Sequence, residues 1–184
     1  MVSGRRICTT ILELEMMSFP ECVDEYKRQM EKGVIPKAYR GLMEYIIGLK
    51  NYFANKYPEY AFPGNLYSGY MDMSYFALYP VLLKEKKLKI AIVFLHEEFR
   101  FEVWLSGVNK QIQKKYYKFM KDNDFQKYRV VPPAKGVDAV IEHILFENPD
   151  FKDLDGLTKR IEEETLLFIH DIEEFLSEHK LEQF

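Results

Sequence analysis

Alternating side-chain character marks residues 88–107 (LKIAIVFLHEEFRFEVWLSG) as a β-hairpin with its turn at Glu97-Glu98. The two-residue period of a strand then separates two faces. The first face is mainly apolar and is predicted to join the core: Ile90, Ile92, Phe94, His96, Phe99, Phe101, Val103 and Leu105. The second face mixes apolar and polar residues: Lys89, Ala91, Val93, Leu95, Arg100, Glu102, Trp104 and Ser106. A half-polar face in the middle of a sheet is where we expect a pocket or a partner surface.

Apolar residues at the helical period of 3.6 predict helices on both sides of the hairpin. Ser18-Phe19-Pro20-Glu21 has the form of a capping box, and a helix should run from it to about Glu31. Its inward positions are predicted to be Val23, Tyr26 and Met30. Further helices are predicted at residues 36–56, 109–122, 137–147 and 154–179.

Residues 66–79 are predicted to form a strand or a broken strand, and residues 128–131 a short one. A short helical turn is expected at residues 81–87. Strands therefore cluster in the middle of the chain, with helices before and after them. This order predicts an α+β fold with a central antiparallel sheet of three to four strands. We expect residues 1–17 to be an N-terminal extension and residues 18–184 to be a single α+β domain.

Composition narrows the class of protein. A chain of 184 residues with 47% hydrophobic and 30% charged residues is typical of a globular domain. Two cysteines, Cys8 and Cys22, do not form a disulfide framework and point to a reducing compartment. The longest apolar run, Ile90 to Leu95, is far shorter than the ~20 residues of a membrane helix. No secretory signal is recognisable, so we expect a cytoplasmic protein without a membrane segment.

Charge is unevenly distributed along the chain. The net charge is −3, but residues 147–184 hold twelve acidic and four basic side chains. The predicted helix at residues 109–122 carries a stripe of lysines, which could follow a phosphate backbone: Lys110, Lys114, Lys118 and Lys121. A sequence pI of about 5.9 argues against nucleic acid, and lysines on an outer helix face are an ordinary solubility pattern.

The mixed face of the hairpin carries the first candidate site. Arg100 is predicted to lie opposite Leu95, Glu102 opposite Val93 and Trp104 opposite Ala91. Arg100 and Glu102 are two residues apart on one strand, so a simple ion pair is one interpretation. As a site, Arg100 would hold an anion, Trp104 would supply a stacking plane and Glu102 would orient Arg100.

A second set, Tyr70, Asp72 and Ser74, alternates along the preceding strand. These residues would share the surface of Arg100 and Glu102 if that strand pairs with the hairpin. The alternative is an edge-strand face that points toward water.

Metal and catalytic motifs are weak. His96 is followed by two glutamates, but neighbouring side chains on a turn point apart, so we interpret it as a turn residue. His143 lies on one predicted helix, and His170 and His179 lie on another without the spacing of metal ligands. Asp72 followed by Glu85-Lys86-Lys87 imitates a nuclease pattern, yet the second part precedes the strand that would have to carry it. We therefore predict no metal and no cofactor.

Four runs give the chain a family resemblance: YRGLMEY at residues 39–45, GYMDM at 69–73, FRFEVWL at 99–105 and ENPDF at 147–151. They resemble an uncharacterised family of small bacterial proteins, a domain of unknown function, over about residues 22–176. The resemblance implies a bacterial, cytoplasmic, single-domain protein. The family has no assigned activity, so no catalytic residue is implied.

The leading hypothesis is a non-enzymatic domain that binds a small anionic or aromatic ligand, or a partner, around Tyr70, Asp72, Arg100, Glu102 and Trp104. The alternative is a divalent-metal-dependent hydrolase or nuclease-like enzyme that uses Asp72 and Glu102. A third hypothesis is an interaction module built on the lysine stripe and the acidic last helix. The sequence leaves open whether the chain is an enzyme and whether it forms a homodimer.

Overall fold

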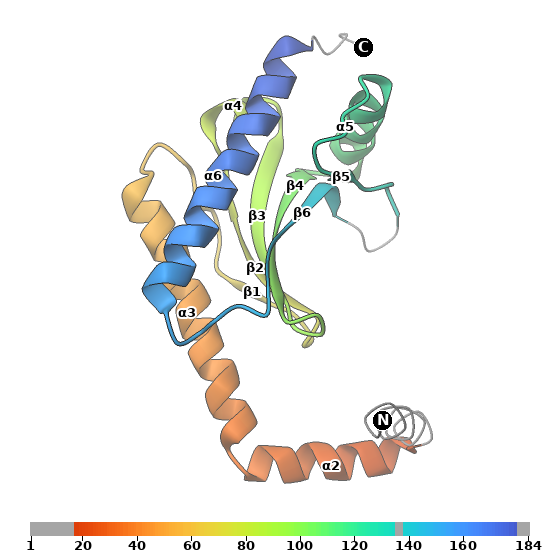
Figure 1. The fold of residues 1–184 in the computed structure, drawn as a ribbon. Coiled ribbons are helices and arrows are strands. Elements are labelled where there is room, and N and C mark those ends of the chain that lie inside the picture. Colours follow the sequence, from red (N-terminus) through yellow and green to blue (C-terminus); the bar gives the residue numbers. More distant parts are fainter. Residues whose placement is uncertain (1–16, 135–137, 180–184) are drawn as a thin grey trace, which may run out of the picture. The chain divides into compact units, whose positions relative to one another are not determined.

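The computed structural model describes residues 17–134 and 138–179 (Figure 1). Backbone contacts divide the chain into two compact units, one ending at Glu44 and the other beginning at Tyr45. The first unit holds α2 (Phe19–Glu31) and the start of α3 (Val34–Lys56). The second unit holds the rest of α3 and all of the sheet. Residues 1–16 lie outside the described part, so the proposed N-terminal extension remains a prediction.

Helix α2 begins where the capping box predicts. The backbone N–H of Ser18 donates to Glu21 Oε2 at 2.7 Å, which satisfies one group at the open end of the helix. The expectation that its apolar residues face inward is wrong, because α2 has no buried residue. Helix α3 begins two residues before the predicted Pro36 and ends at Lys56 as predicted.

The second unit is built around one antiparallel sheet. Its strands and shorter helices are β1 (Tyr67–Ser68), β2 (Met73–Leu78), α4 (Val81–Glu85), β3 (Leu88–Leu95), β4 (Arg100–Gly107), α5 (Lys110–Asp122), β5 (Arg129–Val130) and β6 (Ala139–Glu147), followed by α6 (Leu154–Glu178). The strand order is β1-β2-β3-β4-β6-β5. This arrangement confirms the α+β class, but the described sheet has six strands and not three to four.

The largest correction concerns residues 139–147, which were predicted to be helical and form strand β6. Val140, Ile141 and Leu145 are buried at a spacing that also fits a helix. Periodicity cannot separate the two structures in a short apolar run, and the β-branched residues favour a strand. Pairing with β4 on one side and with β5 on the other decides the outcome.

The hairpin register is as predicted, with Leu95 opposite Arg100, Val93 opposite Glu102 and Ala91 opposite Trp104. Its apolar face is buried except at the turn, where Phe99 is 47% exposed against the prediction, and α6 and the second half of α3 lie against it (Figure 1). Phe53 of α3 contacts Phe76 of β2, and Phe168 of α6 stacks on His143 of β6. We call this side the covered face.

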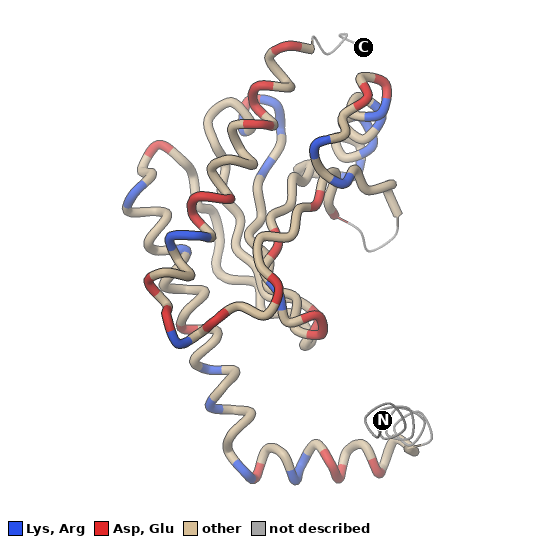
Figure 2. The backbone as a smooth tube through the Cα atoms, viewed as in Figure 1, with Lys and Arg blue, Asp and Glu red and all other residues tan. Residues whose placement is uncertain are grey.

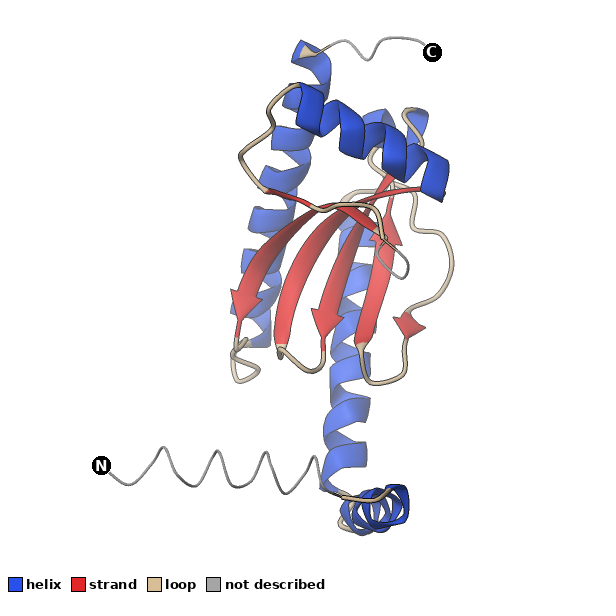
Figure 3. Cartoon of the chain, turned by 90° about the vertical axis from the view of Figure 1, so that its right-hand side faces the viewer, coloured by secondary structure: helices blue, strands red, loops and turns tan. Residues whose placement is uncertain are grey.

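The opposite side, which we call the open face, carries Tyr75, Ala91, Val93, Arg100, Glu102, Trp104, Glu142 and Ile144. Figure 3 shows α5 crossing this side at one end of the sheet, while α6 and the second half of α3 lie behind it. Gln113 of α5 fixes that helix to the strand end by donating to the carbonyl oxygen of Ala139 at 2.9 Å. The predicted division is present in part: Ala91, Val93, Glu102 and Ser106 of the mixed side are buried, whereas Arg100 and Trp104 keep part of their surface exposed.

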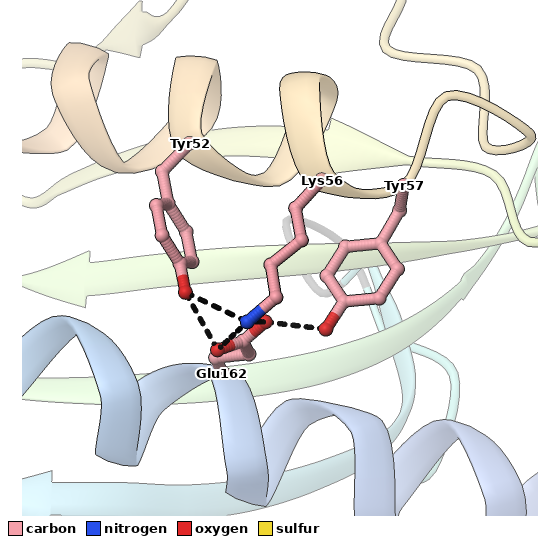
Figure 4. A network of polar contacts seen from close by, with 4 residues as sticks. All are labelled: Tyr52, Lys56, Tyr57 and Glu162. Atoms are coloured by element: carbon pink, nitrogen blue, oxygen red, sulfur yellow. Dashed lines mark hydrogen bonds and ion pairs between the residues drawn. The ribbon is translucent and has the colours of Figure 1, made fainter.

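A buried carboxylate joins the second half of α3 to α6 (Figure 4). Glu162 of α6 accepts a hydrogen bond from Tyr52 at 2.8 Å, pairs with Lys56 at 2.7 Å and accepts a further hydrogen bond from Tyr57. Burial alone would raise the pKa of Glu162, but these donors outweigh that effect and hold the pKa below its ordinary value of 4.5. Burial, followed by the hydrogen bond to Glu162, raises the pKa of Tyr57 to about 12.

Candidate functional site

Three residues of β4 form a connected group on the open face. Arg100, Glu102 and Trp104 alternate along the strand, so their side chains project to the same side. Arg100 donates to Glu102 Oε1 through Nε at 2.7 Å and Nη2 at 2.6 Å, and Trp104 Nε1 donates to Glu102 Oε2 at 2.6 Å. Glu102 is buried and thereby fixes both neighbours. The side chain of Arg100 keeps 24% of its surface exposed, so it remains accessible.

A second charged pair lies beside this group. Glu142 of β6 is the cross-strand partner of Trp104, and Arg129 of β5 is in turn the partner of Glu142. The Arg129 guanidinium lies 3.4 Å from Glu142 Oε2. Burial raises the pKa of Glu142, the nearby charge of Glu102 raises it further, and Arg129 and Arg100 offset part of the effect. Positive and negative side chains therefore alternate across the edge of the sheet.

These side chains surround a pocket of about 430 Å³, which we call the edge pocket. Its charged and titratable lining residues include Arg100, Glu102, Lys127, Arg129, Glu142 and His143. Burial lowers the pKa of His143, so the imidazole is mainly neutral at pH 7. The three cations come from β4, from the loop before β5 and from β5 itself, and each pairs with a carboxylate: Glu102, Asp171 or Glu142.

The structure does not bring Asp72 and Tyr70 into this pocket. The predicted strand breaks after Ser68, and a tight turn follows in which Gly69 N–H donates to the carbonyl oxygen of Met73 at 2.9 Å. A Cβ at Gly69 would lie 2.8 Å from the backbone carbonyl oxygen of Met73, which cannot move aside as a side chain can, so the turn favours glycine there. Backbone N–H groups, first of all that of Met73, lower the pKa of the Asp72 carboxyl. Tyr70 is 96% exposed.

Ser74 and His96 lie on the covered side of the sheet. Ser74 pairs with Phe94, a residue of the covered face, so it does not share a surface with Arg100. His96 Nε2 lies 2.9 Å from Ser74 Oγ, and the backbone N–H of His96 donates to the carbonyl oxygen of Asp72. The sequence prediction of one surface for both sets of residues is therefore wrong for Ser74.

A metal site on Asp72 and Glu102 would require both carboxylates to reach one ion at about 2.0–2.6 Å. Met73 pairs with Leu95, which pairs with Arg100, so two strand spacings of roughly 5 Å separate the two segments. Both carboxylates are also occupied by hydrogen bonds within their own strand or turn. Among the residues that the structure describes, no three His, Cys, Asp or Glu side chains gather as metal ligands would.

Sequence reasoning missed Lys127, Arg129 and Glu142. The reason is the assignment of residues 137–147 to a helix, which removed the strand that brings these side chains together. A usable signal was present, because Glu142 and His143 interrupt a run of β-branched residues. In a strand next to the hairpin, Glu142 would extend the mixed face, whereas His143 would point to the other side.

Asp171 should make stability depend on pH. It accepts a hydrogen bond from Tyr128 at 2.5 Å and pairs with Lys127 at 2.8 Å. Burial alone would raise its pKa, but these contacts outweigh burial and leave the pKa below 3.8. A carboxyl with a depressed pKa in the folded state contributes stability above its unfolded pKa, and this contribution is lost as the pH falls through the folded pKa.

We therefore expect Asp171→Asn to flatten the acid limb of the stability curve, measured by urea unfolding at several pH values from roughly 6 to 3. The exposed residue Glu163 provides the control, because Glu163→Gln should leave the slope unchanged. If the unfolding free energy of Asp171→Asn fell with decreasing pH as steeply as that of the wild type, the depressed pKa of Asp171 would be contradicted.

The fold and the edge pocket define the class of protein: an α+β domain with a six-stranded antiparallel sheet and a charged pocket at one edge of it. The sequence matches the family described as "Domain of unknown function (DUF7000)" over residues 19–176, and the chain belongs to that family. This match confirms the resemblance to an uncharacterised family. No curated protein and no solved structure matches the chain. Within the described ranges, no helix has the length and apolarity to cross a bilayer.

Proposed function

We propose that this protein is a non-enzymatic binding domain that takes a small anion, carrying a carboxylate or phosphate group, in the edge pocket. The observation that carries the proposal is the convergence of Arg100, Lys127 and Arg129 on one pocket of about 430 Å³. Guanidinium groups bind such anions through paired N–H donors. Tyr128 also lines the pocket and offers an aromatic face to a ligand that carries a ring.

The Arg129–Glu142 pair is the contact that a ligand would displace. It is the longest of the ion pairs around the pocket, at 3.4 Å, and the Arg129 side chain is 75% exposed. Exposed ion pairs contribute roughly 0–1 kcal/mol, so an incoming anion competes with little. The raised pKa of Glu142 also makes protonation of that carboxylate easier, and protonation would release Arg129.

Arg129→Ala should abolish ligand stabilisation without harming the fold. Near saturation, with ligand at about 100 times its Kd, binding adds about 2.7 kcal/mol, which corresponds to roughly 5–10 °C in Tm for a domain of this size. The probes are inorganic phosphate and benzoate at matched ionic strength, followed by thermal unfolding. Arg129 is a better target than Arg100, because removal of Arg100 would leave the buried Glu102 without its cation.

Lys114→Ala supplies the matched control, since Lys114 is an exposed cation on α5 outside the pocket. The proposal requires a Tm increase that Lys114→Ala retains and Arg129→Ala loses. An increase lost equally in both variants would indicate unspecific charge attraction and would contradict it, as would no increase with either probe.

We further propose a bacterial, cytoplasmic setting. The low cysteine content and the exposed free thiol of Cys22 support a reducing compartment. Nucleic acid is a less favoured partner than a small anion, because the net charge of the chain is −3. A second copy of the chain is the protein partner that we favour, through a surface distinct from the edge pocket.

A further inference from the structure

The edge pocket contains a mostly buried carboxylate that accepts no hydrogen bond. The side chain of Glu142 is 19% exposed, and within the part of the chain that the structure describes its single polar contact is the 3.4 Å ion pair with Arg129. Side-chain oxygens this far buried in proteins usually accept hydrogen bonds. Glu102, the other carboxylate of the pocket, does so, because Arg100 and Trp104 occupy both of its oxygens. Glu142 therefore has an oxygen available to a ligand.

Loss of the contact between Arg129 and Glu142 has unequal consequences for the two side chains. Arg129 is 75% exposed, so water or a ligand carboxylate can take the place of Glu142 at its guanidinium. Glu142 would keep its charge in a mostly buried place, and burial and the nearby charge of Glu102 already raise its pKa. A partly buried charge without a partner is unfavourable, so a ligand with only a negative charge binds with a penalty. A ligand that also carries a positive charge removes this penalty.

An apolar surface lies beside this ion pair in the same pocket. Ile144 follows Glu142 by two residues on β6, so both side chains project from the open face, and Ile144 is 42% exposed. The ring of Tyr128 lies 4.6 Å from that of His143, and its hydroxyl donates to Asp171 at 2.5 Å, so its position is fixed. The volume of about 430 Å³ is in the range of small-molecule sites. The pocket thus offers both charges and an apolar wall.

We propose that the ligand of the edge pocket is a free α-amino acid with an apolar or aromatic side chain, an inference that rests on the proposed function. Its carboxylate binds Arg129, its ammonium group binds Glu142, and its side chain lies against Ile144 and Tyr128. Arg129 and Glu142 are cross-strand partners on β5 and β6, where basic and acidic positions lie side by side (Figure 2). The ligand exchanges one ion pair of 3.4 Å for two charge-assisted contacts and leaves neither side chain without a partner.

Two sets of matched ligands test the charge requirement by calorimetric titration of the full chain at pH 7 and constant ionic strength. Each set contains an amino acid, the same molecule without its ammonium group and the same molecule without its carboxylate. The first set is phenylalanine, hydrocinnamate and phenethylamine, and the second is leucine, isocaproate and isoamylamine. In at least one set, the amino acid should bind at least tenfold more tightly than the acid and than the amine.

The outcomes separate this inference from the proposed function. Acids or amines that bind as tightly as their amino acids would overturn the inference, and tight binding of the acids would leave the proposed function intact. Binding of phosphate or benzoate without binding of either amino acid would have the same meaning. If none of these compounds binds, the proposed function fails, and the inference fails with it.

Glu142→Gln tests the position of the ammonium group, because glutamine keeps the size of the side chain and removes its charge. In the set that binds better, the acid should bind at least as tightly as to the wild type, and the amino acid at least tenfold more weakly. Retained binding of the acid also shows that the variant is folded. Glu163→Gln, which removes an exposed carboxylate outside the pocket, should leave both affinities unchanged. An unchanged preference for the amino acid in Glu142→Gln would refute the contact with Glu142.

Discussion

Replacement of Glu162 by alanine should lower the free energy of unfolding by about 3 kcal/mol. The carboxylate is buried and accepts hydrogen bonds from Tyr52 and Tyr57, residues more than a hundred positions earlier in the chain. Its removal leaves two phenolic hydroxyls in a half-buried environment without their acceptor. Lys56 is half exposed and can turn toward water, so its loss of a partner adds little.

Urea unfolding at pH 7 measures this effect. Glu163→Ala is the matched control, because Glu163 is the next residue of α6 and is exposed; its replacement should change stability by less than about 0.5 kcal/mol. The loss of stability in Tyr57→Phe should lie between those of Glu162→Ala and Glu163→Ala, because this variant removes one hydrogen-bond donor and leaves the carboxylate bound to the others. A Glu162→Ala variant as stable as the control would mean that the cluster does not hold α3 and α6 together.

Replacement of Glu102 by alanine should cost a similar amount, also about 3 kcal/mol. This residue is buried and accepts hydrogen bonds from both Arg100 and Trp104. Without it, a guanidinium that is only about a quarter exposed loses its counter-ion, and the indole N–H loses its acceptor. The charge of Glu102 also contributes to the raised pKa of Glu142, so that pKa should fall in a Glu102→Gln variant.

The chain has a single tryptophan, so Trp104 fluorescence reports on this group directly. Equilibrium unfolding followed by its emission gives the change in stability, and the native-state spectrum should shift once the indole N–H is no longer bound. Glu97→Ala, in the exposed hairpin turn, is the control and should leave both the stability and the spectrum unchanged. An unchanged native spectrum in Glu102→Ala would show that the contact with Trp104 is absent in solution.

The sequence could predict those parts of the site that depend on residues close together in the chain. Arg100, Glu102 and Trp104 share one strand, and alternation alone places them on one side. Asp72 was grouped with them because residues 66–79 have strand-like composition. The chain turns at Gly69 instead, because a glycine there allows the backbone of Met73 and the Asp72 carboxylate to approach closely. That close approach occurs only in the turn, and the composition of residues 66–79 does not reveal it.

Strand β6 is the part of the fold that the sequence could not predict. A run such as AVIEHILFE has the same apolar spacing in a buried strand and in a helix, and only its neighbours distinguish the two. Those neighbours are β4, more than thirty residues earlier in the chain, and β5. The positions of Arg129 and Glu142 in the edge pocket depend on the same pairing. The prediction of a helix at residues 137–147 therefore also prevented the prediction of this part of the site.

The sequence by itself determined the two faces and the register of the β3–β4 hairpin, the capped start of α2, and the α+β class. These features depend on period, turn residues and caps, whose energies act over a few residues. The tertiary structure alone decided that β6 is a strand, that three cations meet at one edge of the sheet and that Glu162 joins two helices. Each of these requires segments far apart in the chain to pack together, and their contact energy appears only once the chain has folded.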